Sequence, residues 1–171
     1  IERFSDKKAG KDFGVCMNPE YLREKSALED FRKQWVVVIG EYDKKSGDML
    51  SEIYKGFSCP IYRVSIKEAE MQKYVHNLFN ACKISFFNEM REVCSKIGLS
   101  ADKIFPLAAE SAEGMFNPEY GIKNLGAFGG SCLPKDTQAF ASWARKKKIV
   151  LPHLKATIEV NEKVKKKNNS S

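Results

Sequence analysis

The sequence KEAEMQKYVHNLFNACKISFFNEMREVCSKI, residues 67–97, contains neither proline nor glycine, and Gly98 follows it as a suitable C-terminal cap. Apolar residues recur in it at steps of three and four and share one stripe, which predicts a single α-helix about 46 Å long. The stripe consists of Met71, Val75, Leu78, Cys82, Phe86, Met90, Val93 and Ile97. A helix this long and this apolar is expected to pack against more than its own chain.

The opposite face of this helix is polar in an unusual way. At 100° per residue, Lys73, Asn77, Asn80 and Asn88 fall within roughly 80° of one another, with Glu70 at the edge of that arc. Asparagine is a poor helix former, and a solvated face normally carries Lys and Glu. The pattern indicates either hydrogen-bonding groups around a polar ligand or a satisfied polar seam between helices.

The chain before this helix has an α/β pattern. Short apolar runs predict strands at 13–16, 35–40 and 60–64, amphipathic segments predict helices at 20–31 and 47–57, and 43–46 is a polar turn. This order is typical of part of a doubly wound sheet. No G-x-G-x-x-G turn is present in the sequence, so residues 1–66 are expected to be only the C-terminal part of a nucleotide-binding domain.

The chain after residue 66 has no further strand pattern and is expected to be all-α, so that 67–171 forms a helical domain built on the long helix. Helices are predicted at 100–111, 133–147 and 152–166, with Ser100 as an N-cap and Pro106 as a kink. Between them, residues 114–131 are predicted to form a loop rich in Gly and Asn, and loops of that length are usually functional.

Charge and cysteine content narrow the function classes. The formal net charge is +7, but 22 acidic residues are mixed with 29 Lys and Arg, and the basic clusters at 145–148 and 163–167 are typical of helix ends. This disfavours nucleic acid and leaves a small anionic ligand as a use for the basic surface. No run reaches the length of a membrane span. Five cysteines without metal-binding spacing favour a reducing cytoplasm and predict no metal site.

A second informative stretch is GAFGGSCLPKD, residues 126–136. Pro134 suits the first turn of a helix, which places Cys132 just ahead of that helix. The helix dipole and the neighbouring Lys135 would favour the thiolate there, as a nucleophilic cysteine requires. The alternative is a small buried hydrophobe, a role that suits the other four cysteines, Cys16, Cys59, Cys82 and Cys94.

Three motifs resemble those of one known family, the UDP-glucose/GDP-mannose dehydrogenases. Residues 129–136 (GGSCLPKD) resemble its nucleophile motif, 18–24 (NPEYLRE) its glutamate segment, and EMQKYVHN (70–77) with KISFFNE (83–89) its long helix. The resemblance implies the end of the NAD-binding domain followed by the central dimerisation domain, with the long helix forming a homodimer. It also implies that the first half of the NAD-binding domain and a C-terminal nucleotide-sugar domain are missing, so the isolated chain is expected to be inactive.

The resemblance further implies an activity, the oxidation of a nucleotide sugar's primary alcohol to a carboxylate with two NAD+, through a thiohemiacetal and a thioester on Cys132. Lys73 and Asn77 would stabilise the oxyanion, Glu20 would act as general base, and Asp136 would hydrogen-bond in the same site. Lys135 would lie near the cofactor. Substrate contacts would come from Glu24, Asn88, Lys123 and Gly129. If 20–31 is helical, Glu20 and Glu24 share one face.

Several alternatives remain open on the sequence. Residues 127–130 and 39–43 lean towards the GDP-mannose enzymes and Lys123 towards the UDP-glucose enzymes, so the sugar nucleotide is undecided. A helical dimerisation or binding module without activity is the rival from another class. A Cys-His hydrolase is disfavoured because neither His76 nor His153 has a spacing that predicts contact with Cys132. The K-x-x-x-N pair also occurs in β-hydroxyacid dehydrogenases of the 6-phosphogluconate type, which need no thiol.

Overall fold

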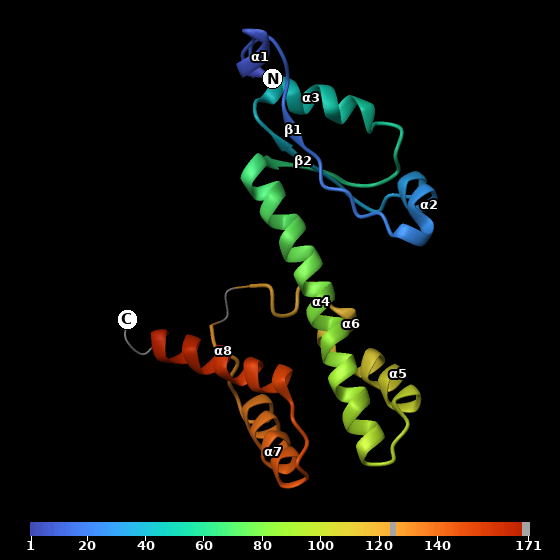
Figure 1. Ribbon diagram of the computed structural model, residues 1–171, viewed down its shortest axis with the longest axis vertical. Coiled ribbons are helices and arrows are strands. Elements are labelled where there is room, and N and C mark those ends of the chain that lie inside the picture. The colour runs from blue at the N-terminus through green and yellow to red at the C-terminus, as the bar shows by residue number, and fades with distance from the viewer. Residues whose placement is uncertain (124–125, 169–171) are drawn as a thin grey trace. The chain divides into compact units, whose positions relative to one another are not determined.

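The computed structural model describes residues 1–123 and 126–168 (Figure 1). The chain forms two compact units, Ile1–Asn80 and Ala81–Ser171, and each is described by itself. The division falls inside the long helix α4 (Ile66–Lys96), which has the bounds predicted for it to within one residue. The domain boundary expected at residues 66 and 67 stays a prediction.

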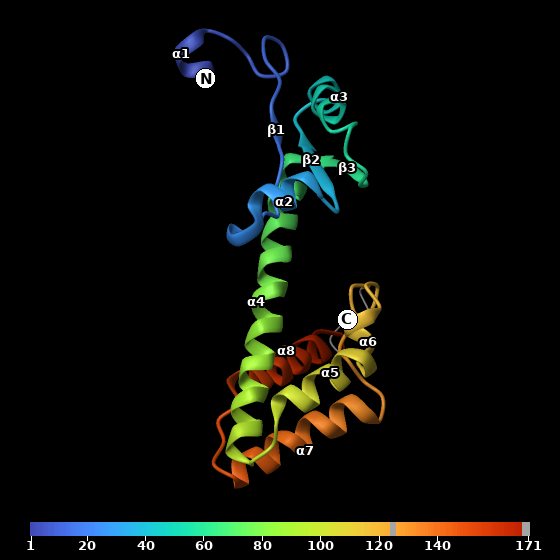
Figure 2. The same cartoon turned by 90° about the vertical axis from the view of Figure 1, so that its right-hand side faces the viewer.

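The first unit is built on a three-stranded mixed sheet. Strand β2 (Val37–Glu41) lies in the middle, antiparallel to β1 (Cys16–Met17) and parallel to β3 (Ile61–Ser65). Helix α3 (Lys44–Ile53) connects the two parallel strands, as such a connection requires (Figures 1 and 2). The expected fold class, a partial sheet of about three short strands followed by helices, is therefore confirmed.

Strand β2 and the start of α4 form the core of this unit. Val37 and Ile39 are almost fully buried, and so is Ala69 on α4. A Cβ atom at Gly40 would lie 2.6 Å from the Cβ of Ala69 and 3.0 Å from the Cα of Ile66. Residue 40 must therefore be glycine for α4 to pack this closely against the strand.

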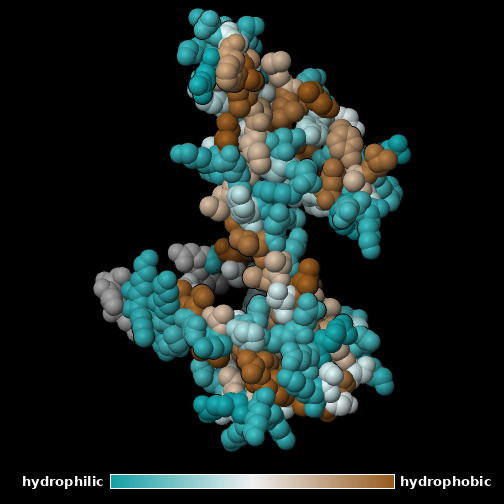
Figure 3. Space-filling model, in the orientation of Figure 1, coloured by the Kyte–Doolittle hydropathy of each residue, from teal (hydrophilic) through white to brown (hydrophobic). Residues whose placement is uncertain are grey.

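Within the apolar stripe of α4, only Val93 is buried. Val93 is 3% exposed, whereas Met71, Val75 and Leu78 are 63%, 59% and 62% exposed. Apolar side chains are visible at the surface of the segment that Figure 1 labels α4 (Figure 3). The part of the stripe that belongs to the first unit thus presents apolar surface within that unit.

The second unit packs four further helices with the C-terminal part of α4. They are α5 (Ala101–Ser111), α6 (Glu113–Phe116), α7 (Cys132–Lys146) and α8 (Pro152–Asn168) (Figure 2). The core consists of Val93, Ala144, Ile149 and Leu151, against which Met90, Phe140, Trp143 and Leu154 pack. The core therefore joins α4, α7 and the start of α8.

A buried carboxylate fixes the start of α8. Glu89 on α4 is 9% exposed and accepts hydrogen bonds from the backbone N–H groups of His153, at 2.7 Å, and Leu154, at 3.1 Å. These amides are two of the N-terminal donors that a helix leaves without partners, and Pro152 before them has no N–H to satisfy. Glu89 thus caps α8 from another helix.

We expect Glu89→Ala to lower the free energy of unfolding by about 1–3 kcal/mol, because two buried amides lose their acceptor. Urea unfolding followed by circular dichroism measures this. Glu92→Ala is the matched control, since it removes an exposed carboxylate from the same helix and only an i,i+4 ion pair with Lys96, worth about 0.3–0.5 kcal/mol. Equal losses in the two variants would contradict the capping role.

One predicted helix is wrong in its first half. Residues 20–23 are not helical, and the segment folds as a 3₁₀ turn, Glu24–Ser26, followed by α2 (Ala27–Arg32). Side chains bind the backbone amides here: the Glu20 carboxylate accepts from Leu22 N–H and the Asp30 carboxylate from Arg23 N–H. Such bonds compete with a helix, so Glu20 and Glu24 do not share a helical face.

Other boundaries differ for local reasons. Helix α3 begins earlier than expected because the Asp43 carboxylate caps it by accepting from Ser46 N–H at 2.9 Å. Ser100 precedes α5 without a side-chain cap bond. The loop expected at 114–131 is interrupted at its start by α6, and Asn124 and Leu125 lie outside the described residues. The first strand is shorter than predicted, and a short helix, α1 (Glu2–Ser5), was not predicted.

Candidate functional site

In the first unit, the lysine and the glutamate predicted to be catalytic are in direct contact. Lys73 on α4 forms an ion pair with the Glu20 carboxylate at 3.1 Å and also donates to the Glu20 backbone carbonyl. The Lys73 ammonium also lies 5.2 Å from the centre of the Tyr21 ring. These residues are 53 positions apart, so the fold has brought together two of the three motifs.

Glu20 is held in its ionised form. The Leu22 backbone N–H and then the Lys73 ammonium lower the pKa of the Glu20 carboxyl below its ordinary value. A carboxylate with a lowered pKa is charged at neutral pH and can accept a proton, but it is a weaker base than an unpaired one. A general base at Glu20 would gain strength if a substrate drew Lys73 away.

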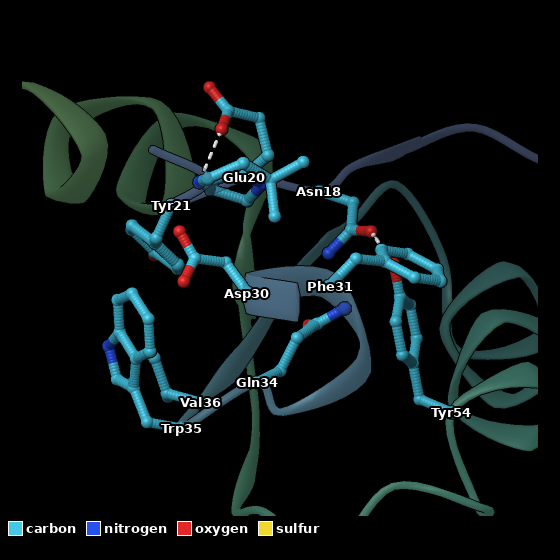
Figure 4. A pocket seen from close by; sticks show the side chains of 11 residues that line it. Asn18, Glu20, Tyr21, Asp30, Phe31, Gln34, Trp35, Val36 and Tyr54 are labelled. Carbon is cyan, nitrogen blue, oxygen red and sulfur yellow. Dashed lines mark hydrogen bonds between the residues drawn. The ribbon is translucent and has the colours of Figure 1, made fainter. Parts of the chain in front are cut away.

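A small cavity of about 130 Å³ lies beside this ion pair (Figure 4). Four aromatic side chains contribute to its wall, together with polar groups from the glutamate segment (residues 18–24) and α2. Its lining includes Asn18, Glu20, Tyr21, Asp30, Phe31, Gln34, Trp35 and Tyr54. Asn18 donates to Val38 C=O at 2.8 Å and accepts from the Tyr54 hydroxyl at 2.5 Å. Asn18 therefore fastens the segment before Glu20 to the sheet.

Tyr21 is a site component that sequence reasoning missed. Its hydroxyl donates to Gln72 Oε1 at 2.5 Å, its ring centre lies 4.8 Å from that of His76, and burial raises its pKa. Tyr21 thus joins the glutamate segment to α4 through two residues, Gln72 and His76, that lie before and after Lys73. Its position directly after Glu20 in the motif was the available signal.

Arg23 and Asp30 give the glutamate segment its shape. The Asp30 carboxylate is buried and accepts from Arg23 N–H, from the Arg23 guanidinium and from the Ser26 hydroxyl. These hydrogen bonds, with the Arg23 guanidinium first, hold the pKa of the Asp30 carboxyl well below its ordinary range. Glu24 lies on the turn that this network closes, and its side chain is exposed.

In the second unit, the candidate nucleophile opens a helix. Cys132 is the first residue of α7, one position inside the helix rather than ahead of it, and it is exposed. The Ser131 hydroxyl lies 3.7 Å from its sulfur. Lys135 and Asp136, both exposed, form an ion pair at 3.3 Å in the next turn. A thiol at this position faces the N–H end of the helix.

The remaining candidates are on the surface of the units. Asn77 and Asn88 are exposed on α4. Lys123 is also exposed and pairs with Glu119 at 3.5 Å. Gly130 has a φ of 76°, which favours glycine, whereas Gly129 has open space where a Cβ would be and no packing need for glycine. The predicted substrate contacts of these residues stay predictions.

Residues 1–123 and 126–168, the part that the structure describes, contain neither a membrane-spanning helix nor a metal-binding cluster. No helix in these ranges is both long enough and apolar enough to span a bilayer. No cluster of three or more His, Cys, Asp or Glu side chains in them is arranged to hold a metal ion.

Comparison with known proteins identifies the family whose domains match this chain. The NAD-binding domain of the UDP-glucose/GDP-mannose dehydrogenase family matches residues 1–58, and the central domain of that family matches residues 67–163. GDP-mannose 6-dehydrogenase of Pseudomonas aeruginosa is 38% identical over 161 residues, 94% of this chain and 37% of that protein. A UDP-glucose 6-dehydrogenase of Bacillus subtilis is 38% identical over 148 residues, 86% of this chain and 33% of that protein.

Solved structures agree. The crystal structure of a ternary complex of GDP-mannose dehydrogenase from P. aeruginosa superposes with a TM-score of 0.87 at 38% identity, over 95% of this chain and 37% of that one. A UDP-glucose dehydrogenase from Pyrobaculum islandicum gives a TM-score of 0.58 at 38% identity, over 90% of this chain and 35% of that one.

The mixed sheet, the long helix and these matches together define part of a protein built from an NAD-binding domain and a central domain of the UDP-glucose/GDP-mannose dehydrogenase type. The chain belongs to the UDP-glucose/GDP-mannose dehydrogenase family. It spans about a third of the length of the curated relatives that it matches.

Proposed function

We propose that this chain supplies the nucleophile and the oxyanion-stabilising groups of an enzyme that oxidises the primary alcohol of a nucleotide sugar to a carboxylate. The observation that carries the proposal is the contact between Lys73 and Glu20, which joins two motifs of the family in one place. Cys132 at the start of α7 supplies the third motif.

Lys135 is the residue of this chain that is proposed to lie near the NAD cofactor. Its exposed ammonium, one helical turn after the thiol, can face an anionic group of the cofactor. The sequence contains no G-x-G-x-x-G turn to cradle the pyrophosphate, so we expect the 171-residue chain alone to form no NADH. The chemistry that bound NAD+ would supply is a hydride acceptor for each of the two oxidations.

The residues act on the carbon that is oxidised. After the first oxidation has produced an aldehyde, the Cys132 sulfur bonds to the carbonyl carbon and forms a thiohemiacetal. The second oxidation converts this adduct into a thioester. Water then attacks the thioester carbon, the C–S bond breaks, and the carboxylate leaves while the thiolate is restored. A thiolate at a helix N-terminus is suited to both bond formation and departure.

The polar groups stabilise the charge that develops on oxygen. The Lys73 ammonium and the Asn77 amide, one helical turn apart on α4, would donate to the oxyanion in both addition steps. Glu20 would take a proton from the hydrolytic water. Asp136, which pairs with Lys135, would hydrogen-bond in the same site.

The substrate is proposed to be a GDP- or UDP-sugar. Relatives with both specificities are similar to this chain at the same level of identity. Glu24, Asn88, Lys123 and Gly129 are the proposed substrate contacts, and their exposure leaves them accessible. Their charges alone do not distinguish the two nucleotides.

The test uses a full-length dehydrogenase in which these residues replace the matching third of the P. aeruginosa enzyme, called here the grafted enzyme. We expect it to form NADH with GDP-mannose or UDP-glucose, with two NADH for each sugar oxidised to its acid. The matching shape of the segment makes the replacement feasible. A folded grafted enzyme that binds a nucleotide sugar but forms no NADH would contradict the proposal.

A second candidate function, compatible with the first, is homodimerisation through α4. The exposed side chains of Met71, Val75 and Leu78 favour it, because apolar surface of this kind is normally covered by a partner. Sedimentation equilibrium tests it, and a chain that sediments only as a monomer would contradict it.

The cytoplasmic location predicted from the cysteines stays a prediction; all five are free thiols.

A further inference from the structure

The loop that leads to Cys132 is held by one side chain of α8. Asn161 is 9% exposed, and its side-chain amide both accepts a hydrogen bond from and donates one to the backbone of a single loop residue, Phe128. Its Oδ1 accepts from Phe128 N–H at 2.6 Å, and its Nδ2 donates to Phe128 C=O at 3.1 Å. The Asn161 amide thus pairs with the N–H and C=O of Phe128 as the backbone of a neighbouring β-strand would.

The start of α7 needs such an anchor. Ser131 occupies the N-cap position but makes no side-chain cap bond, so the first turn, which contains Cys132, lacks the usual restraint. Gly129 and Gly130 precede it, and glycine has the largest backbone freedom. Phe128, fastened by Asn161, is therefore a fixed point four residues before the thiol.

The anchor is itself fixed to the rest of the unit. Asn161 lies on α8, whose first turn is capped by Glu89 of α4. Asparagine inside a helix is unfavourable for the helix, so a buried one indicates a specific hydrogen-bonding role. The contacts form a continuous path from α4 through α8 to the loop before Cys132.

We propose that Asn161 is a positioning residue for the nucleophile: it holds the backbone at Phe128 and thereby keeps Cys132 in the first turn of α7. This inference rests on the proposed function for the role of Cys132. The contact of Asn161 with the loop is independent of that role, so the two can be tested separately.

The experiment compares Asn161→Ala, Asn161→Asp and the control Glu162→Ala, an exposed neighbour on the same helix. Hydrogen exchange of residues 127–133 reports the loop, and we expect it to be about tenfold faster in Asn161→Ala because two hydrogen bonds are lost. Asn161→Asp keeps the acceptor for Phe128 N–H and loses the donor to its carbonyl, so it should lie between Asn161→Ala and the unsubstituted chain.

Iodoacetamide labelling in the same samples reports the thiol. The free thiol N-acetylcysteine, added to the same samples, is the reference. The ratio of the Cys132 rate to the N-acetylcysteine rate should fall about fivefold in Asn161→Ala as the helix end frays. Buried Cys94 reports general opening of the unit, and its rate should not change.

The outcomes separate the two proposals. If Cys132 reacts no faster than N-acetylcysteine in the unsubstituted chain, the nucleophile assignment fails, and exchange alone decides the role of Asn161. If exchange of 127–133 in Asn161→Ala stays within about twofold of the Glu162→Ala control, the positioning role is overturned. A matching rise in Cys94 labelling would show general loosening and would also overturn it.

Discussion

Replacing Cys132 with alanine should reduce acid formation by the grafted enzyme on the order of 10³-fold or more, because the second oxidation loses the covalent adduct on which it acts. The first oxidation requires no thiol, so NADH formed per sugar should fall from two towards one, with aldehyde as the product. This ratio, measured from NADH absorbance and product analysis, separates loss of the nucleophile from loss of folding.

Cys59→Ala is the matched control for this substitution. Cys59 is also a free thiol, but it lies in the segment before β3 and not at a helix start. We expect acid formation with this variant to stay within about twofold of the unsubstituted enzyme, because Cys59 has no proposed role. Two NADH per sugar in Cys132→Ala would show that the thiol takes no part in the chemistry.

Lys73→Ala is the second substitution with a large expected effect. Removing one preorganised donor to an oxyanion typically costs about 10²–10³-fold in kcat, and we expect a loss in that range with a smaller change in KM. Lys73→Arg should rescue little, since the guanidinium has a different shape and donor arrangement. Steady-state kinetics with both nucleotide sugars measures these values.

The control for Lys73 is Lys67→Ala, which removes an exposed ammonium from the first turn of the same helix. Its kcat should remain close to that of the unsubstituted enzyme. Lys73→Ala also frees Glu20 from its ion pair, so the pKa of the Glu20 carboxyl should rise towards its ordinary value. A kcat of Lys73→Ala within about fivefold of the control would contradict the oxyanion role.

The long helix and the strands β2 and β3 could be predicted because their signals are local. The three- and four-residue apolar period between residues 67 and 97 and its glycine end determine α4, and β-branched runs mark β2 and β3. The segment at 20–31 was predicted wrongly because its apolar spacing suits a helix. There, carboxylates of Glu20 and Asp30 bind backbone amides that a helix would need, and only the folded geometry shows this.

The candidate site was predictable in composition and less so in arrangement. The motif resemblance picked out Glu20 and Lys73, and their ion pair is a finding of the structure. Tyr21, Asn161 and Glu89 were missed because each acts across many residues of sequence: the Glu89 carboxylate, for example, binds an amide 64 positions away. A buried polar residue in a helical pattern is the sequence signal for such contacts, but it does not name the partner.

The tight packing of Gly40 against α4 has a consequence for how this sequence can change over generations. Shrinking Ala69 to glycine would remove only one of the atoms that a new methyl group at residue 40 would meet, because main-chain atoms of Ser65 and Ile66 lie within 3.1 Å of that point. No compensating side-chain replacement can move them. Residue 40 should therefore resist drift even in descendants whose surface residues have changed widely.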